Sequence, residues 1–359
     1  MKLTKVMIFT ALLVTVVFSN VAAQTLEIKD QGFGTAGGTV RTNSGSIDTS
    51  DVYTNRKGQT VHGDNASYFY QIPEKSKKLS LVFLHGNTQS GKCWSTTADG
   101  REGFQNIFLR SGYSVYLVDQ PRRGQAGNST QNASVASPAD DQRNFNQFRF
   151  GLWPNFYKGV QFPADKKILD NFFFQMTPNI GSFDFGVINT AMSALFDKTG
   201  PAVFFTHSAS GMIGWQTAMK NKNVRAIVAI EPGAFVVPES KAFKNPANSF
   251  TETTGMDTSP IPVSDEEFKK LCSIPIIIYF GDNIPSERSR EPGEDFWRVK
   301  LTEAKRFADI VNSMGGNCAV VHLPEIGIKG NTHFIMSDLN NKEVASHIEK
   351  WLKTQGLDK

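Results

Sequence analysis

From about residue 79 onward, the chain alternates between short apolar runs and longer amphipathic stretches. The apolar runs are 79–84, 114–118, 202–205, 224–230, 274–280 and 319–323. Runs this short and apolar throughout are typical of strands buried on both faces of a sheet. The stretches that separate them have helical spacing, for example 102–110, 188–196, 211–220, 301–314 and 342–354. This alternation predicts an α/β fold with a mostly parallel central sheet flanked by helices.

Three segments depart from that alternation. Residues 24–78 mix glycine, serine and threonine with short alternating stretches such as 67–72, which favour antiparallel edge strands. Two further segments, at about 126–185 and 233–268, follow strands on what would be one side of the sheet, so we expect cap-like insertions over a site. The first is rich in phenylalanine, which either lines a pocket for an apolar group or packs the insertion onto the main domain.

The N-terminus has the pattern of an export signal. Lys2 and Lys5 precede an apolar stretch at 6–18, and small residues at 21–23 offer a cleavage site before Gln24. The apolar stretch is shorter than the ~20 residues that a membrane-spanning helix needs. We therefore expect a signal peptide at 1–23, a mature single domain at 24–359 without a membrane anchor, and a periplasmic or secreted location.

Charge and cysteine content narrow the partners and the covalent structure. The net charge is only +4 and no long run of like charges occurs, so nucleic acid is not an expected partner. The cysteines are Cys93, Cys272 and Cys318, which allow at most one disulfide within the chain. If 272 and 318 begin neighbouring parallel strands, both sulfurs lie near the same sheet edge, so we propose a bridge between them; the alternative is that both are small buried apolar residues.

The strongest chemical signal is the segment 203–211, VFFTHSASG, in which an apolar strand meets a turn and then a helix. Ser208 stands at the apex of a small-x-Ser-x-small pattern, with Thr206 and Ser210 where glycine is usual. Such a turn exposes a serine hydroxyl in a strained backbone. It also directs the N–H of Ala209 toward the site, at the positive end of the next helix. Ser208 is thus the candidate nucleophile, in preference to Ser210, whose neighbours do not fit the pattern.

A second turn, at 84–88, follows the apolar run 79–84 and reads Leu-His-Gly-Asn-Thr. In folds of this type the corresponding loop supplies a second N–H to an oxyanion, and Asn87 is the candidate donor. His85 is expected to hold the loop together rather than to react.

The candidate base is His333, which lies in a loop after the last apolar run and before the final helix. Two acids compete to orient it. Asp282 follows the run 274–280, but it comes directly after Gly281, earlier in the loop than usual. Glu231 directly follows the run 224–230 and precedes Pro232-Gly233. A turn there would present its carboxylate at the sheet edge where Ser208 is expected. We favour Glu231 and keep Asp282 as the alternative.

Taken together, Ser208, His333 and the His85-Gly86 loop resemble the α/β-hydrolase superfamily, over almost all of 79–352. Segments 94–100, 119–124, 231–233 and 331–334 are similar to a branch of exported bacterial esterases whose triad acid is a Glu after strand six. The resemblance implies hydrolysis of carboxylic esters. That branch includes a member with adjacent cysteines in the oxyanion loop, where this chain has Asn87 and Thr88, so a disulfide there does not carry over.

These inferences predict a serine esterase that acts through an acyl-enzyme on a small or medium, partly apolar ester. The sequence has no metal-ligand spacing and no phosphate-binding glycine loop, so no cofactor is expected. The same residues also suit a lactonase, thioesterase or amidase. A non-catalytic binding protein of the same fold is the alternative from another class. Oligomeric state is not predicted.

Overall fold

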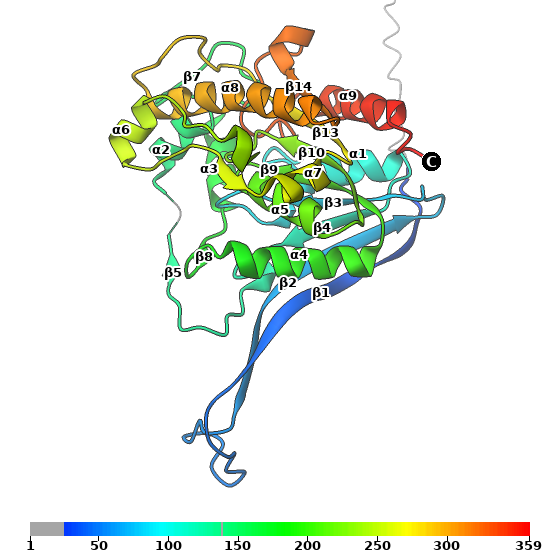
Figure 1. The fold of residues 1–359 in the computed structure, drawn as a ribbon, viewed down its shortest axis with the longest axis vertical. Coiled ribbons are helices and arrows are strands. Elements are labelled where there is room, and N and C mark those ends of the chain that lie inside the picture. Colours follow the sequence, from blue (N-terminus) through cyan, green and yellow to red (C-terminus); the bar gives the residue numbers. More distant parts are fainter. Residues whose placement is uncertain (1–24, 138) are drawn as a thin grey trace, which may run out of the picture.

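A computed structural model describes residues 25–137 and 139–359, so the signal-peptide prediction at 1–23 lies outside the described residues. The chain forms an eight-stranded sheet in the order β1-β2-β4-β3-β9-β10-β13-β14 (Figure 1). All neighbours from β4 to β14 pair in parallel, while β2 is antiparallel to both β1 and β4. The predicted mostly parallel sheet is confirmed. Its strands are β1 (Ile28–Thr42), β2 (Thr60–Pro73), β3 (Ser80–Leu84), β4 (Val115–Asp119), β9 (Ala202–His207), β10 (Val224–Ile230), β13 (Pro275–Phe280) and β14 (Asn317–His322).

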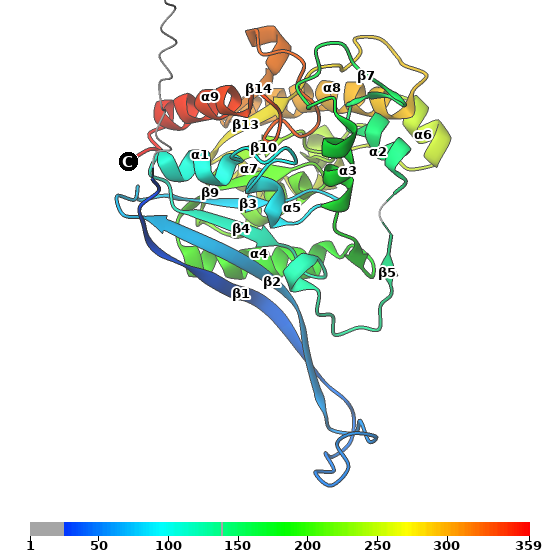
Figure 2. The same ribbon diagram turned by 180° about the vertical axis from the view of Figure 1, so that it is seen from behind.

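The antiparallel strands predicted within 24–78 are present as β1 and β2, and both are longer than the alternating stretch 67–72. They form one long hairpin that runs out past the body of the molecule (Figures 1 and 2). Of these two strands β1 lies at the edge of the sheet, whereas β2 pairs on its other side with β4. Aromatic rings line the hairpin and its neighbour: Phe33 packs on Phe69 at 4.9 Å between ring centroids, and Tyr70 stacks on Tyr116 at 5.7 Å. Such cross-strand pairs stabilise strands that glycine would otherwise weaken.

Helices cover both faces of the sheet. Because successive side chains of a strand point to opposite faces, alternate residues of each central strand belong to different cores. In β9, for example, Phe204 belongs to the core that includes residues of α4, α5 and α8, whereas Phe205 belongs to the core that includes residues of α1 and α9. The covering helices are α1 (Phe104–Arg110), α4 (Phe185–Thr199), α5 (Ser210–Lys220), α7 (Asp265–Leu271), α8 (Pro292–Ser313) and α9 (Asn341–Thr354).

Helix α8 begins nine residues before the predicted start at 301. Its first turns carry Pro292, Glu294 and Asp295, residues that favour a helix N-terminus but break the apolar periodicity. The extension matters because it brings Trp297 and Lys300 to the site described below.

Both insertions carry secondary structure of their own and connect strands at the carboxyl edge of the sheet. The phenylalanines at positions 145, 150, 162 and 172 are buried in one core with Phe334. Much of the Phe-rich segment therefore packs the insertion onto the domain. The first insertion contains β5 (Val135–Ala136), α2 (Asp141–Gln147), β6 (Gly151–Leu152), β7 (Asn155–Phe156), α3 (Lys166–Phe174) and β8 (Asn179–Ile180), and the second contains β11 (Val236–Pro238), α6 (Ser249–Thr254) and β12 (Ile261–Val263).

The expected bridge between Cys272 and Cys318 is wrong in this structure, in which Cys93, Cys272 and Cys318 are all free. The prediction placed both residues at strand ends. Cys318 does lie in β14, opposite Ile276 of β13. Cys272 instead caps α7, where its Sγ contacts the Phe268 carbonyl at 3.5 Å, so the two are not at matching positions of one sheet.

None of the helices in the described ranges combines the length and the apolar content that crossing a bilayer requires.

Candidate active site

Ser208 lies directly after β9, in a left-handed backbone conformation with φ of 55°. Its N–H donates to the Ile230 carbonyl at 3.0 Å, and its own carbonyl accepts from the N–H groups of Gly211 and Gly233, also at 3.0 Å. A non-glycine residue in this conformation is strained and persists only where its surroundings hold it. Here β10 and the start of α5 hold the serine at the sheet edge, half exposed.

Small residues around Ser208 make room for this turn. A Cβ at Gly86 would lie 2.7 Å from the Cβ of Ser208, and one at Gly211 would lie 2.5 Å from Pro232. Thr206 stands where glycine is usual, and a Cβ at Gly214 on α5 would meet its methyl group at 2.8 Å. Thr206 is larger than the usual glycine, and the missing side chain of Gly214 leaves the space that its methyl group occupies.

Ser210, the rival nucleophile, is buried and engaged in the turn. Its Oγ accepts from the N–H of His207 at 2.8 Å and lies 2.9 and 3.0 Å from the carbonyl oxygens of His207 and Leu84. These contacts join β3, β9 and α5, so the Ser210 hydroxyl stabilises the turn that carries Ser208.

Glu231 occupies the corresponding position after β10, with φ of 43°. One carboxylate oxygen, Oε2, accepts from Nδ1 of His333 at 2.6 Å, and the other, Oε1, accepts from the N–H of Gly281 at 2.6 Å and from Arg149. Burial by itself would raise the pKa of Glu231, but Arg149 and His333 outweigh it and hold that pKa at about 2. The carboxylate is therefore ionised at neutral pH.

His333 is held on several sides. The backbone N–H of His333 donates to the Phe148 carbonyl at 2.9 Å, and the backbone carbonyl of His333 accepts from Nε2 of His207 at 2.9 Å. Phe148 stacks on the imidazole at 5.5 Å between centroids, and Trp297 packs against it at 4.3 Å. Burial lowers the pKa of His333, while Glu231 opposes that shift. With Nδ1 bonded to Glu231, Nε2 is the nitrogen available for proton transfer.

Asp282, the alternative acid, does not contact His333. One of its carboxylate oxygens accepts from the N–H of Gly330 at 2.7 Å and the other from the N–H of Asn283 at 2.7 Å. A second carboxylate that the sequence analysis missed, Asp338, accepts from the N–H and hydroxyl of Thr332 at 2.7 and 2.8 Å. Burial raises the pKa of Asp338 to about 7. Both acids shape the loop that carries His333.

The loop after β3 is held by His85, which is fully buried. Nδ1 of His85 donates to the Gly86 carbonyl at 2.8 Å, and Nε2 accepts from the N–H of Gln120 at 3.3 Å. Burial lowers the pKa of His85 to about 3, so the ring is neutral and fits this tautomer. The loop brings Asn87 to the same pocket as Ala209, the residue that precedes α5.

Ser208, His333, Asn87 and Ala209 all line one cavity of about 650 Å³, to which both insertions contribute. Most of the surface that lines it is apolar, although Arg143, Asp257 and Lys300 also contribute to the walls. The apolar wall residues include Phe148, Phe183, Phe185, Met212, Ala234, Phe250, Ile261, Phe296 and Trp297.

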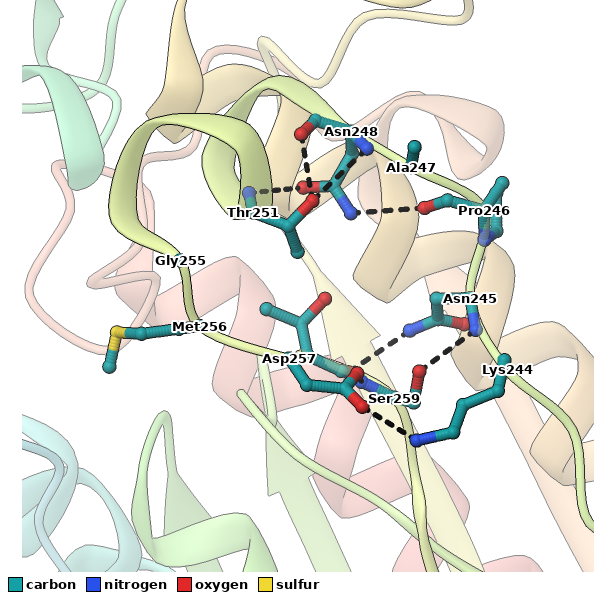
Figure 3. Close-up of a pocket in the computed structure, with 11 residues that line it drawn as sticks. Lys244, Asn245, Pro246, Ala247, Asn248, Thr251, Gly255, Met256, Asp257 and Ser259 are labelled. Atoms are coloured by element: carbon teal, nitrogen blue, oxygen red, sulfur yellow. Dashed lines mark hydrogen bonds and ion pairs between the residues drawn. The ribbon is translucent and has the colours of Figure 1, made fainter.

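Residues of the second insertion also line a smaller, open cavity of about 330 Å³ (Figure 3). Its walls are braced by Asn248, which caps α6, and by the ion pair of Lys244 with Asp257 at 2.6 Å. Residues 256–259 line both cavities. Lys300 of α8 holds this segment by donating to the Thr258 carbonyl at 2.6 Å.

Within the described residues, no cluster of three or more His, Cys, Asp or Glu side chains is arranged to hold a metal ion. The structure brings together Ser208, His333, Glu231, Asn87 and Ala209, which the sequence analysis singled out. The structure also places Phe148, Arg149 and Trp297 at this site, and the sequence did not point to these three residues. The one available signal for Arg149 was a lone cation within the Phe-rich run 145–150.

Comparison with known proteins agrees with this architecture. The model of the "Alpha/beta hydrolase family" matches residues 81–355. A solved structure described as a novel bacterial esterase superposes with a TM-score of 0.73 at 29% identity, covering 93% of this chain and 98% of that one. A probable secreted lipase, phiG, from a fungal species (strain ATCC 74256) is 28% identical over 88% of this chain and 92% of its own. The predicted resemblance to esterases of this fold is confirmed, and the chain belongs to the alpha/beta hydrolase family.

Proposed function

We propose that this protein is a serine carboxylic-ester hydrolase, with Ser208 as nucleophile, His333 as general base and Glu231 as the acid that orients it. The observation that carries the proposal is the 2.6 Å bond between Glu231 and Nδ1 of His333, beside a pocket that Ser208 shares with His333. This bond selects the tautomer whose Nε2 accepts the serine proton. Ionised Glu231 also stabilises the imidazolium that forms.

The reaction proceeds in two acyl-transfer steps. Oγ of Ser208 attacks the ester carbonyl while Nε2 of His333 takes its proton, and the backbone N–H groups of Asn87 and Ala209 stabilise the oxyanion. Collapse of the tetrahedral intermediate expels the alcohol, which leaves with the proton from His333. Water, activated by the same imidazole, then attacks the acyl-enzyme and releases the acid.

The substrate is a small or medium ester with an apolar part. The cavity volume of about 650 Å³ suits a ligand of modest size, and its aromatic and aliphatic walls favour hydrocarbon over charge. The comparisons add support, because one relative is described as an esterase and the other as a lipase. The lipase is also described as secreted, which agrees with the proposed export to the periplasm or the medium.

The test combines turnover with covalent labelling. Wild type is expected to hydrolyse nitrophenyl esters from acetate upward in chain length and to be labelled by a fluorophosphonate at Ser208, as located by peptide mass spectrometry. Ser208→Ala is expected to lose both ester turnover and labelling. Ser210→Ala is expected to keep the label on Ser208, because the Ser210 hydroxyl is bonded within the turn and does not react. Wild-type turnover by Ser208→Ala, or a label on another residue, would overturn the assignment.

A further inference from the structure

Two consecutive residues of the first insertion contact the acid and the base proposed above. The Phe148 carbonyl accepts from the N–H of His333 at 2.9 Å, and its ring stacks on the imidazole. The next residue, Arg149, donates from Nη2 to Oε1 of Glu231. The insertion that covers the pocket is thereby joined to both members of the pair, which come from β10 and from the loop before α9.

Arg149 is completely buried, and its backbone is left-handed with φ of 57°. Its Nε donates to the Asp282 carbonyl at 2.9 Å, and its guanidinium lies 5.3 Å from the ring centre of Trp297. Burying a guanidinium is costly unless its charge is matched. The charge that matches it is the carboxylate of Glu231, whose second oxygen is bonded to His333.

We propose that Arg149 is a positioning residue for the Glu231–His333 pair: it fixes the carboxylate orientation and, by its charge, keeps the imidazole unprotonated to lower pH. This inference rests on the proposed function, because it concerns the base of that reaction. Arg149 is not among the residues that line the pocket, so its effect on turnover would act through Glu231 and His333.

The charged and titratable neighbours come from several elements. His207 at the end of β9 packs on His333 at 4.4 Å, and burial lowers the pKa of His207 well below its usual range, so it is neutral. Asp338 lies in the loop of His333, and Asp282 lies beside Arg149 after β13. Tyr157 and Glu294, which are bonded to each other, lie near Arg149. Within this described set, Arg149 is the group whose positive charge opposes protonation of His333.

The direction of the effect does not depend on which partner holds the proton. Glu231 and His333 are bonded, so they titrate as a coupled pair, and the form able to act as base is the one with ionised Glu231 and neutral His333. A nearby positive charge disfavours adding a proton to either group. Removing the charge of Arg149 therefore raises the proton affinity of the pair and moves the acid limb of activity to higher pH.

The experiment measures the pH dependence of fluorophosphonate labelling and of kcat/KM in the full chain for wild type, Arg149→Met, Arg149→Gln and Arg149→Lys. Arg149→Met and Arg149→Gln are expected to shift the acid limb up by about one pH unit, which makes labelling about tenfold slower below the limb. Arg149→Gln can still donate to Glu231, so its shift isolates the charge from the hydrogen bond. Arg149→Lys retains the charge and is expected to keep the acid limb of the wild type.

The matched control is Arg122→Met. Arg122 is also buried at positive φ and paired with a buried carboxylate, Asp64, at 2.7 Å, but it follows β4 and its partner belongs to β2, not to the Glu231–His333 pair. This variant should lose stability without moving the acid limb. An unmoved acid limb in folded Arg149→Gln would overturn the inference while Ser208 is still labelled. Failure of the proposed function looks different, since Ser208 of the wild type would then stay unlabelled at every pH.

Discussion

Ser208 and Glu231 occupy equivalent positions on neighbouring parallel strands, each being the first residue past its strand. His207 of β9 pairs with Ile230 of β10, and the residues that follow them both have positive φ, of 55° and 43°. The N–H of Ser208 bonds to the Ile230 carbonyl, so the two turns are linked through the backbone. The strain in each turn is thus supported by the same sheet edge, which presents a hydroxyl and a carboxylate side by side.

Glu231→Gln should remove most of the activity and some of the stability. Loss of the carboxylate leaves His333 without its proposed orienting partner, and we expect kcat to fall by about 10³ to 10⁴-fold. Arg149 then keeps its charge in a buried site without a counter-charge, which costs about 3–5 kcal/mol in the free energy of unfolding. Ester turnover and urea denaturation measure the two effects.

Asp282→Asn is the control for this variant, because Asp282 contacts the loop backbone and not His333. It should keep kcat within about threefold of wild type. If Asp282→Asn were the more damaging change of the two, Glu231 would not be the acid.

Gly86→Ala should impair catalysis more than folding. The added methyl group would lie 2.7 Å from the Cβ of Ser208 and 3.0 Å from Nδ1 of His207, so either the serine or the loop after β3 must move. Displacements of about 1 Å at a reacting atom cost about 10²-fold in rate, which is the loss in kcat that we expect. Gly186→Ala in α4 meets its nearest atom at 3.4 Å and should leave kcat unchanged. Equal kcat in the two variants would contradict the crowding argument.

Phe250→Ala should change chain-length preference. Phe250 belongs to α6 of the second insertion, lines the cavity and packs on Phe296 at 4.8 Å. Its removal takes apolar contact from the acyl or alcohol part of longer esters, so kcat/KM for them should fall by about tenfold relative to acetate. Phe174→Ala, an exposed position outside this cavity, should keep the wild-type profile. A uniform loss over all chain lengths in Phe250→Ala would indicate that the insertion does not contact substrate.

Asp338 should make stability depend on pH near neutrality. Its pKa is about 7 in the fold against 3.8 for an unperturbed Asp, so the folded state holds the proton more tightly. The contribution is fully present below the lower value and is lost as pH rises through about 7. The free energy of unfolding of wild type, relative to Asp338→Asn, should therefore fall between about pH 5 and about pH 8. Urea denaturation at both values checks this, and a constant difference between the two proteins would contradict it.

Features that depend on local pattern could be predicted from the amino-acid sequence. Apolar runs such as 224–230 form central strands, because burial on both faces requires that composition. The small residues around Ser208 predicted the turn, because larger side chains would not fit there. The late loop with His333 followed from the order of the elements. The sequence left open whether the phenylalanines of the first insertion line a pocket or pack the insertion onto the domain. Both occur, because Phe148 lines the pocket and Phe150 is buried in the core.

Which distant groups meet could not be predicted in this way, because it depends on how the whole chain folds. Glu231 rather than Asp282 reaches His333, across 102 positions of the chain, and Arg149 reaches Glu231 across 82. The bridge expected between Cys272 and Cys318 failed for the same reason, because the exact end of α7 sets where Cys272 lies. Local pattern records which face of an element is buried. The partner across a contact depends on strand register and loop path, which arise when the whole chain packs.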